Sequence, residues 1–109
     1  MAETYKVLGQ VNPSATTLTT GYTVPAATSA VVSTVSVANR SATPTAFRLS
    51  VAVAGAADNN IQYLAYDVPI AGNETQTLTL GVTLATTDIV RVYATVATLS
   101  FNIFGVEIT

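Results

Sequence analysis

The chain of 109 residues contains no cysteine, no histidine and no tryptophan. Without cysteine there is no disulfide and no thiolate nucleophile, and without histidine there is no imidazole base. Zinc fingers, redox switches and catalytic triads built on these side chains are therefore excluded. The residue types identify no reaction, so we expect a protein that is not an enzyme, with no catalytic residues, no metal and no cofactor.

Charge is also scarce. Charged residues make up 9% of the chain, and four Lys and Arg against six Asp and Glu leave a formal net charge of −2. Binding to a nucleic acid depends largely on clustered cations that neutralise phosphates, and one Lys with three scattered Arg forms no such cluster. We therefore expect no nucleic-acid partner.

No uninterrupted apolar run approaches the roughly 20 residues that a membrane-spanning helix needs, so we expect no membrane partner. The start of the chain, Met1–Lys6, lacks the basic and apolar regions of a secretion signal. Synthesis and folding in a reducing cytoplasm are the corresponding expectation.

Threonine, alanine and valine dominate what is present, with 19, 17 and 15 copies. Valine and threonine fit a pleated sheet, and the long helix formers are scarce. A domain of this size usually carries about a quarter charged residues, so something else must cover its exterior. We expect a homo-oligomer whose subunits cover part of the surface. The alternative is a soluble monomer with a threonine-rich exterior.

Eight segments have the two-residue alternation of strands, separated by turns rich in Pro, Gly and Asn. They span residues 5–10, 16–24, 29–38, 47–54, 61–68, 74–84, 89–95 and 99–108. This spacing predicts one all-β domain over residues 1–109, a single antiparallel β-sandwich resembling a jelly roll, without a helix longer than two turns. Pro25 and Pro69 are expected to end the strands that precede them.

Two strands carry more specific predictions. Alternation places Phe47, Leu49, Val51 and Val53 on one face, which we expect to be core. In the last strand, the apolar residues change from odd to even positions between Ile103 and Phe104. A strand can change parity through a bulge, and glycine tolerates the necessary torsions, so we expect a bulge near Phe104–Gly105.

Carboxylates form only weak candidate sites. Asp58, Asn59 and Asn60 could offer oxygens to Ca²⁺, but adjacent Asp and Asn in a loop are usually explained by turn geometry. Asp67 and Glu74 could be drawn as the carboxylate pair of a glycosidase, but nothing in the sequence places them across a cleft. We favour turn solvation in both cases.

Five residues are candidates for an interface: Arg40, Arg48, Arg91, Tyr63 and Tyr66. In a chain so poor in charge, an arginine on a strand is expected to have a carboxylate partner or a protein interface. For Arg91 an ordinary pair with Asp88 or Asp67 is an equal alternative. The tyrosines could stack on a carbohydrate, although core or subunit interface is the preferred interpretation.

Three segments carry a resemblance: ATTLTTGYTVPAATSAVVSTVSVANRSATPTAFRLSVAVAG (15–55), YLAYDVPIAGNETQTLTLGVTLATTDIVRVYA (63–94) and LSFNIFGVEIT (99–109). In these segments the chain resembles the small β-sandwich virion proteins of tailed bacteriophages. The resemblance consists of strand and turn patterns without a site motif, so it transfers no catalytic residue.

The resemblance implies a non-enzymatic structural protein that is made in the host cytoplasm and located in the virion. The first expectation is an oligomeric capsid decoration (cement) protein that binds the major capsid protein and stabilises the particle. The alternative is a tail, baseplate or tail-fibre component, including a receptor- or carbohydrate-binding tip. Residues 1–4 are expected either to reach a neighbouring subunit as an arm or to fray.

Overall fold

The computed structural model describes residues 2–109, which form eight strands and two single-turn 3₁₀ helices. The strands are β1 (Glu3–Val11), β2 (Thr19–Thr23), β3 (Ser29–Asn39), β4 (Thr45–Ala52), β5 (Tyr63–Ile70), β6 (Thr75–Leu84), β7 (Ile89–Ala94) and β8 (Leu99–Ile108). The helices are η1 (Val53–Gly55) and η2 (Asn60–Gln62). The predicted all-β fold is confirmed. Neither helix of residues 2–109 has the length or apolar character that crossing a membrane requires.

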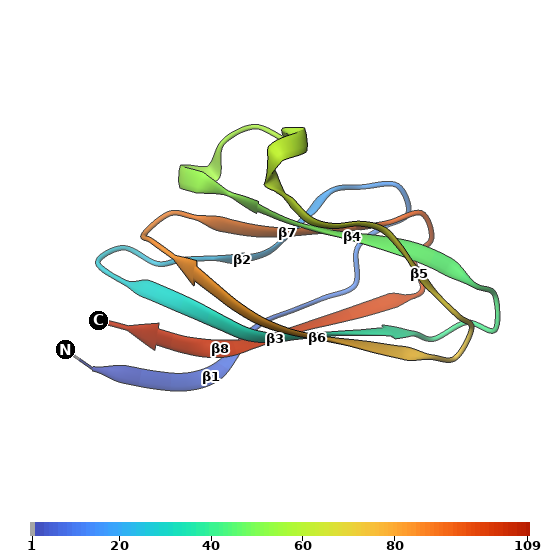
Figure 1. Cartoon of the computed structure of the whole chain (residues 1–109), viewed down its shortest axis with the longest axis horizontal. Helices are drawn as coiled ribbons and strands as arrows, with labels where there is room; N and C mark the ends of the chain where they lie inside the picture. Colours follow the sequence, from blue (N-terminus) through green and yellow to red (C-terminus); the bar gives the residue numbers. More distant parts are fainter. Residues whose placement is uncertain (1) are drawn as a thin grey trace.

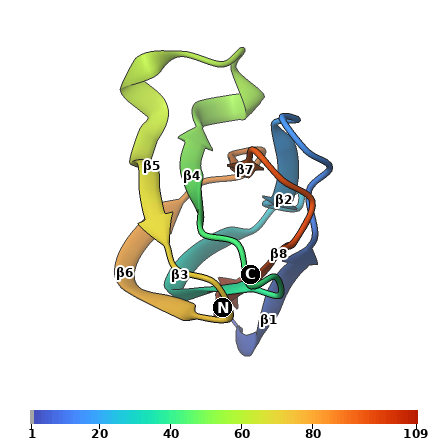
Figure 2. The ribbon, with the colours of Figure 1, turned by 90° about the vertical axis from the view of Figure 1, so that its right-hand side faces the viewer.

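The strands form two antiparallel four-stranded sheets that pack face to face (Figure 1). One sheet has the order β1-β8-β3-β6 and the other the order β2-β7-β4-β5. Every connection except that from β4 to β5 passes from one sheet to the other. This order is that of an eight-stranded jelly roll. Figure 2 shows the two layers end-on, with β5 and β6 along one open side.

The two ends of the chain pair with each other. β8 lies between β1 and β3, and its last residues pair with the first residues of β1. The Ala2 N–H donates to the Thr109 carbonyl, and the Thr109 N–H donates to the Ala2 carbonyl, at 2.8 and 2.9 Å. Residues 2–4 are therefore held along β8 in this structure and do not project as an arm. Met1 lies outside the described residues.

The core lies between the sheets and receives buried side chains from every strand except β1, whose Leu8 and Val11 pack against it from partly buried positions. The largest fully buried side chains are Phe47, Leu49, Ile70, Leu99, Phe101 and Ile103. Phe47 of β4 meets Phe101 of β8 edge to face, with ring centroids 6.0 Å apart, an arrangement that aromatic pairs favour. This contact joins the two sheets.

The predicted core face of β4 is only partly correct. Phe47 and Leu49 are buried and Val51 packs against the core from a partly buried position. Val53 is 69% exposed, so its assignment to the core is wrong. The strand ends at Ala52, and the backbone turns into η1 through Ala54, whose φ is +55°. The turn breaks the alternation and carries Val53 away from the sheet.

The predicted bulge also lies on different strands. β8 pairs without interruption, and its partners contain the extra residues: Leu8 of β1 and Ser33 of β3. Leu8 lies opposite the Ile103–Phe104 step and Ser33 opposite the Phe104–Gly105 step. Since β8 keeps its alternation, Leu99, Phe101 and Ile103 face the core, whereas Phe104, Val106 and Ile108 lie on the opposite face. The change of parity therefore marks an apolar outer surface.

β5 begins later and ends later than expected. Residues 60–62 form η2, and the strand continues through Pro69 to Ile70. Pro69 did not end the strand because β5 is an edge strand that pairs with β4 alone, so a missing donor is tolerated. The pairing of β5 with β4 shifts register twice, on either side of the Leu49–Ala65 pair.

Candidate functional site

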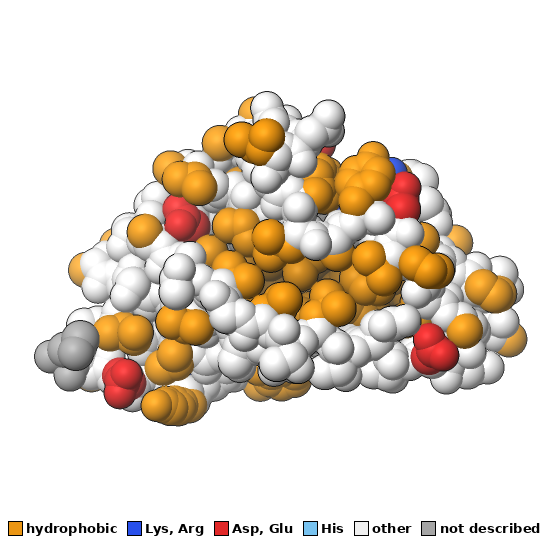
Figure 3. All heavy atoms as spheres, in the orientation of Figure 1, with side chains coloured by type: hydrophobic (Ala, Val, Ile, Leu, Met, Phe, Trp, Pro, Cys, Tyr) orange, Lys and Arg blue, Asp and Glu red, His pale blue; other side chains and the backbone are white. Residues whose placement is uncertain are grey.

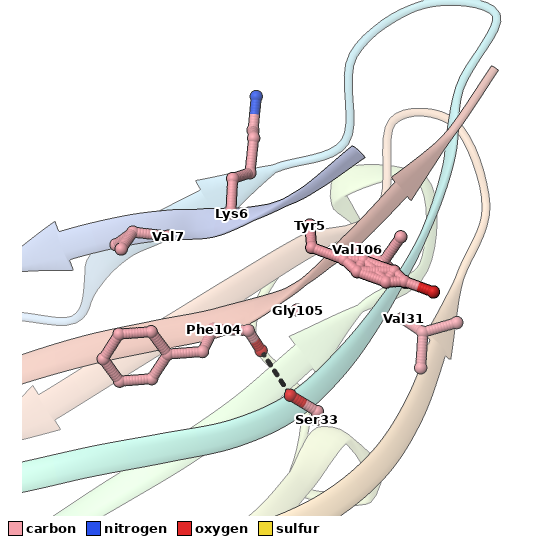
Figure 4. A pocket seen from close by; sticks show the side chains of 8 residues that line it. All are labelled: Tyr5, Lys6, Val7, Val31, Ser33, Phe104, Gly105 and Val106. Carbon is pink, nitrogen blue, oxygen red and sulfur yellow. Dashed lines mark hydrogen bonds between the residues drawn. The ribbon is translucent and has the colours of Figure 1, made fainter. Parts of the chain in front are cut away.

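An exposed apolar surface covers one end of the outer face of the β1-β8-β3-β6 sheet. We call it the β1–β8 patch and define it by Tyr5, Val7, Val31, Phe104 and Val106. Tyr5 is 72% exposed and Val7 47% exposed, and the other three are half-buried. They line an open hollow of about 510 Å³ (Figure 4). A surface of this kind on a small domain is typical of an interaction site.

Local backbone geometry brings the three strands of the patch together. Gly105 of β8 allows a close approach to β3, because a Cβ atom there would overlap the carbonyl oxygen of Val31. The Ser33 hydroxyl, on the extra residue of β3, donates to the Phe104 carbonyl at 3.3 Å. These two contacts hold β8 close to β3, where Val106 lies opposite Val31, and Phe104 lies on the other side of Ser33 (Figure 4).

The cation nearest the patch in sequence points away from it. Lys6 projects to the opposite side of β1 (Figure 4), where its ammonium lies 2.7 Å from a Glu107 carboxylate oxygen. The Tyr22 hydroxyl donates to the other oxygen of Glu107 at 2.6 Å. These two partners lower the pKa of Glu107, Lys6 contributing more than Tyr22. The outer face thus keeps its apolar character.

A second surface lies on the outer face of the β2-β7-β4-β5 sheet. We call it the tyrosine–arginine cluster and define it by Arg48, Tyr63, Tyr66 and Tyr93. The guanidinium carbon of Arg48 lies 4.1 Å from the ring centroid of Tyr66 and 4.4 Å from that of Tyr93. Its Nε donates to Asp67 at 2.8 Å. This hydrogen bond is the largest of the causes that raise the pKa of Arg48.

Backbone irregularity in β5 builds this cluster. Asp67 has a φ of +52°, and the strand contains an extra residue relative to β4 between Ala65 and Val68. In a regular strand, Tyr66 and Asp67 would face opposite sides. The irregularity allows both side chains to reach Arg48, one through its ring and the other through its carboxylate.

The tyrosines border a shallow hollow of about 440 Å³ that is lined by Asn60, Tyr63 and Tyr66. The two tyrosine rings meet edge to face, with centroids 5.0 Å apart, and Tyr66 is 55% exposed. The Tyr63 hydroxyl donates to Asp58 at 2.9 Å. Burial, followed by this hydrogen bond, raises the pKa of Tyr63. The hollow therefore offers aromatic rings beside the side-chain amide of Asn60.

The other two arginines are used differently. Arg91 shares the outer face with Tyr93 but donates to the carbonyls of Ala56 and Gly55, at 2.8 and 3.4 Å. The alternative of an ordinary pair with Asp88 or Asp67 is wrong, because Asp67 binds Arg48 and Asp88 accepts from the backbone N–H groups of Ala54 and Ala85. Arg91 thus anchors the loop after β4.

Arg40 lies in the connection between β3 and β4 and binds the loop after β1 and the loop before β8. It donates to the Asn12 side chain at 2.9 Å and to the Ala97 carbonyl at 3.2 Å. Of the five interface candidates, the structure brings together Arg48, Tyr63 and Tyr66. Arg91 lies on the same sheet face, whereas Arg40 serves a separate loop contact.

The weak carboxylate candidates have structural partners. Asn59 caps η2 by accepting from the Ile61 N–H, Asp58 binds Tyr63, and Asp67 is paired with Arg48. Glu74 lies 3.5 Å from the Gln76 amide. Within residues 2–109, no three carboxylates gather closely enough to hold a metal ion.

The β1–β8 patch was not predicted as a site. Its signal is the parity change at Ile103–Phe104, which predicts a bulge near Phe104–Gly105 but in the structure marks an apolar outer face. The role of Tyr93 in the cluster depends on the register of β7 against β4, where it lies opposite Arg48. That register cannot be obtained from alternation alone.

Compared with protein-family models, curated proteins and solved structures, the chain matches none.

Proposed function

We propose that this chain is a non-enzymatic structural protein of a tailed-phage virion, an oligomeric capsid decoration protein that docks on the particle and stabilises it. The observation that carries the proposal is the β1–β8 patch, because it leaves Tyr5 and Val7 exposed on a sheet face with no nearby cation directed at it. Binding of another protein over such a patch is favourable, because it removes apolar side chains from water.

Two further features support this function. Eight-stranded jelly rolls occur in viral capsid proteins, which is an analogy at the level of fold. The sequence supplies no imidazole and no thiol, and its charge is too scarce to solvate the whole exterior. The proposed partners are further copies of this chain and the major capsid protein, with synthesis in the host cytoplasm and final location in the virion.

The test is binding to particles assembled without this protein. Full-length protein is expected to co-sediment with such particles at micromolar concentration. The double variant Val7→Thr/Val106→Thr keeps the size and strand preference of both side chains but makes the patch more polar. It should weaken particle binding by about tenfold, which corresponds to roughly 1.4 kcal/mol.

The matched control is Val53→Thr/Ile61→Thr, which makes the same kind of change at two exposed residues away from the patch, 69% and 91% exposed. It should bind like the unaltered chain. Failure of the unaltered chain to bind would overturn the decoration function. Equal binding by the patch variant and the control would remove the patch from it.

A tail or tail-fibre tip that binds a carbohydrate is the second candidate, because a specific observation favours it. Exposed Tyr66 borders the hollow with Asn60 and Tyr63, and an aromatic ring beside polar groups is suited to a sugar ring. A panel of bacterial surface oligosaccharides would test it. Binding that Tyr66→Ala abolishes and Tyr5→Ala leaves unchanged would support this function over decoration.

A further inference from the structure

The sandwich is open along the side where β5 and β6 form the edges of the two sheets. Figure 3 shows apolar side chains gathered in a hollow between them. We call this hollow the edge groove. Its walls are Val51 and Leu64 on one sheet and Leu80 and Val82 on the other. Leu64 is 52% exposed, and the other three are partly buried. The core therefore reaches the surface here.

β6 combines this groove with a free backbone edge. The strand pairs with β3 on one side only, so its other side presents unpaired N–H and C=O groups. It is ten residues long and has no proline and no charged residue. A long, uncharged edge strand is a template for pairing with another strand.

The other three edge strands each have features that discourage pairing with another strand. β2 has only five residues and a register shift. β5 carries Pro69 and two register shifts. β1 carries Glu3 and Lys6, and charged side chains discourage pairing at an edge. β2 and β6 both lack a proline and a charged residue and both have a register shift, but β6 is ten residues long and β2 only five.

The side chains of β6 make the strand complementary to itself. Threonine occupies the exposed outer positions 75, 77, 79 and 83, and leucine or valine occupies the inner positions 78, 80, 82 and 84. In an antiparallel pair related by a two-fold axis perpendicular to the sheet, outer residues meet outer residues and inner meet inner. Threonine would face threonine or Gly81, and the inner residues near the axis would be apolar.

We infer that β6 pairs with β6 of a second copy of this chain, giving a two-fold dimer with a continuous eight-stranded sheet. The inference deepens the proposed oligomeric assembly and rests on it for the occurrence of self-association. The occupant is a second copy because the groove and the strand lack charge, so two identical strands meet without repulsion. The paired strands bring the two edge grooves together, which removes their apolar side chains from water.

The test uses opposite charges at Thr79, an exposed residue near the middle of β6 with its side chain on the outer face. The unaltered chain should sediment as a dimer at micromolar concentration. Thr79→Lys and Thr79→Glu should each sediment as monomers, because the two-fold axis places like charges close together. An equimolar mixture of the two variants should recover the dimer, because the charges then attract.

Gln10→Lys is the matched control, since it adds the same charge to an exposed position on β1, the other edge of the same sheet. It should remain dimeric. A monomeric unaltered chain, dimers of either single Thr79 variant, or a mixture that stays monomeric would each overturn the inference. Particle binding is measured separately with the patch variants, so loss of the dimer and loss of docking are distinguishable.

Discussion

The hydroxyl of Tyr22 lies 2.6 Å from a carboxylate oxygen of Glu107. Tyr22 belongs to β2 in one sheet and Glu107 to β8 in the other, so this hydrogen bond crosses the sandwich. Lys6 binds the second oxygen from β1. Burial and the bond to Glu107 raise the pKa of Tyr22. A polar link between Tyr22, Glu107 and Lys6 therefore joins the two sheets.

Because of this link, part of the free energy of unfolding should be lost at low pH. The pKa of Glu107 lies below its ordinary value of 4.5 because Lys6 and Tyr22 donate to the ionised form. Its stabilising contribution is therefore complete above the unfolded pKa and is lost as the pH falls through the lower folded pKa. Glu107→Gln should reduce the free energy of unfolding by about 1–3 kcal/mol at pH 7.

Urea denaturation at a series of pH values measures this effect. The difference between Glu107→Gln and the unaltered chain should shrink steadily on acidification below the ordinary pKa of 4.5. Glu3→Gln is the control, because Glu3 is exposed on β1, the strand that carries Lys6, and has no ion pair among the described contacts. A difference that is the same at every pH would contradict the assignment.

Two glycines in the same sheet should respond in opposite directions to alanine. At Gly81 an added Cβ meets nothing within 4 Å. Gly81→Ala should therefore raise the free energy of unfolding by about 0.5–1 kcal/mol, because alanine lowers the conformational entropy of the unfolded chain. At Gly105 the Cβ would overlap the Val31 carbonyl oxygen, so Gly105→Ala should lower it by about 1–3 kcal/mol. Thermal melting of both variants measures the contrast, and a shift of the same sign in both would contradict it.

Truncation of Leu49 should test the core. Leu49 is 2% exposed and packs between the sheets, so Leu49→Ala should lower the free energy of unfolding by about 2–5 kcal/mol. Val53→Ala should change it by less than about 0.5 kcal/mol, because Val53 is exposed after the strand has ended. Chemical denaturation of the pair measures both. A small effect at Leu49 would mean that β4 buries its other face.

Replacing Arg48 with lysine keeps the positive charge but removes the planar guanidinium group, so it tests how much that group contributes to stability. The planar guanidinium stacks near Tyr66 and Tyr93 while its Nε donates to Asp67, and an ammonium cannot do both. Arg48→Lys should lower the free energy of unfolding by about 1 kcal/mol. Arg40→Lys should have a smaller effect, since Arg40 stacks on no ring among the described contacts. Equal melting temperatures for the two variants would contradict this role.

Alternation was sufficient to predict the number and approximate positions of the strands, because inward-facing residues recur every second position. It failed where the backbone leaves that period. Val53 follows the alternation but lies in a turn after β4. Pro69 is tolerated because β5 is an edge strand, a position that the sequence could not reveal. Edge or central position depends on which strands pair, and pairing is a property of the whole fold.

The residues of the tyrosine–arginine cluster were predicted in part, but their arrangement was not, because it also depends on backbone irregularity. Tyr63, Tyr66 and Arg48 were selected by residue type, and the structure places them together. Their geometry depends on the irregularity at Asp67, for which the sequence has no glycine as a signal. The β1–β8 patch depends on extra residues in the neighbours of β8, so the parity change in β8 alone could not show which strand was irregular.

The central place of β8 between β1 and β3 has a kinetic consequence. Of the eight strands of this domain β8 is synthesised last, yet both β1 and β3 depend on it for a partner. Closing β1 against β8 joins residues about a hundred positions apart, and long-range pairings of this kind form slowly. Until then, β1 lacks its only partner strand and the aromatic rings of β8 are missing from the core. We therefore expect the nascent chain to acquire its final sheet only after translation of residue 108, with a period of vulnerability to aggregation before that step.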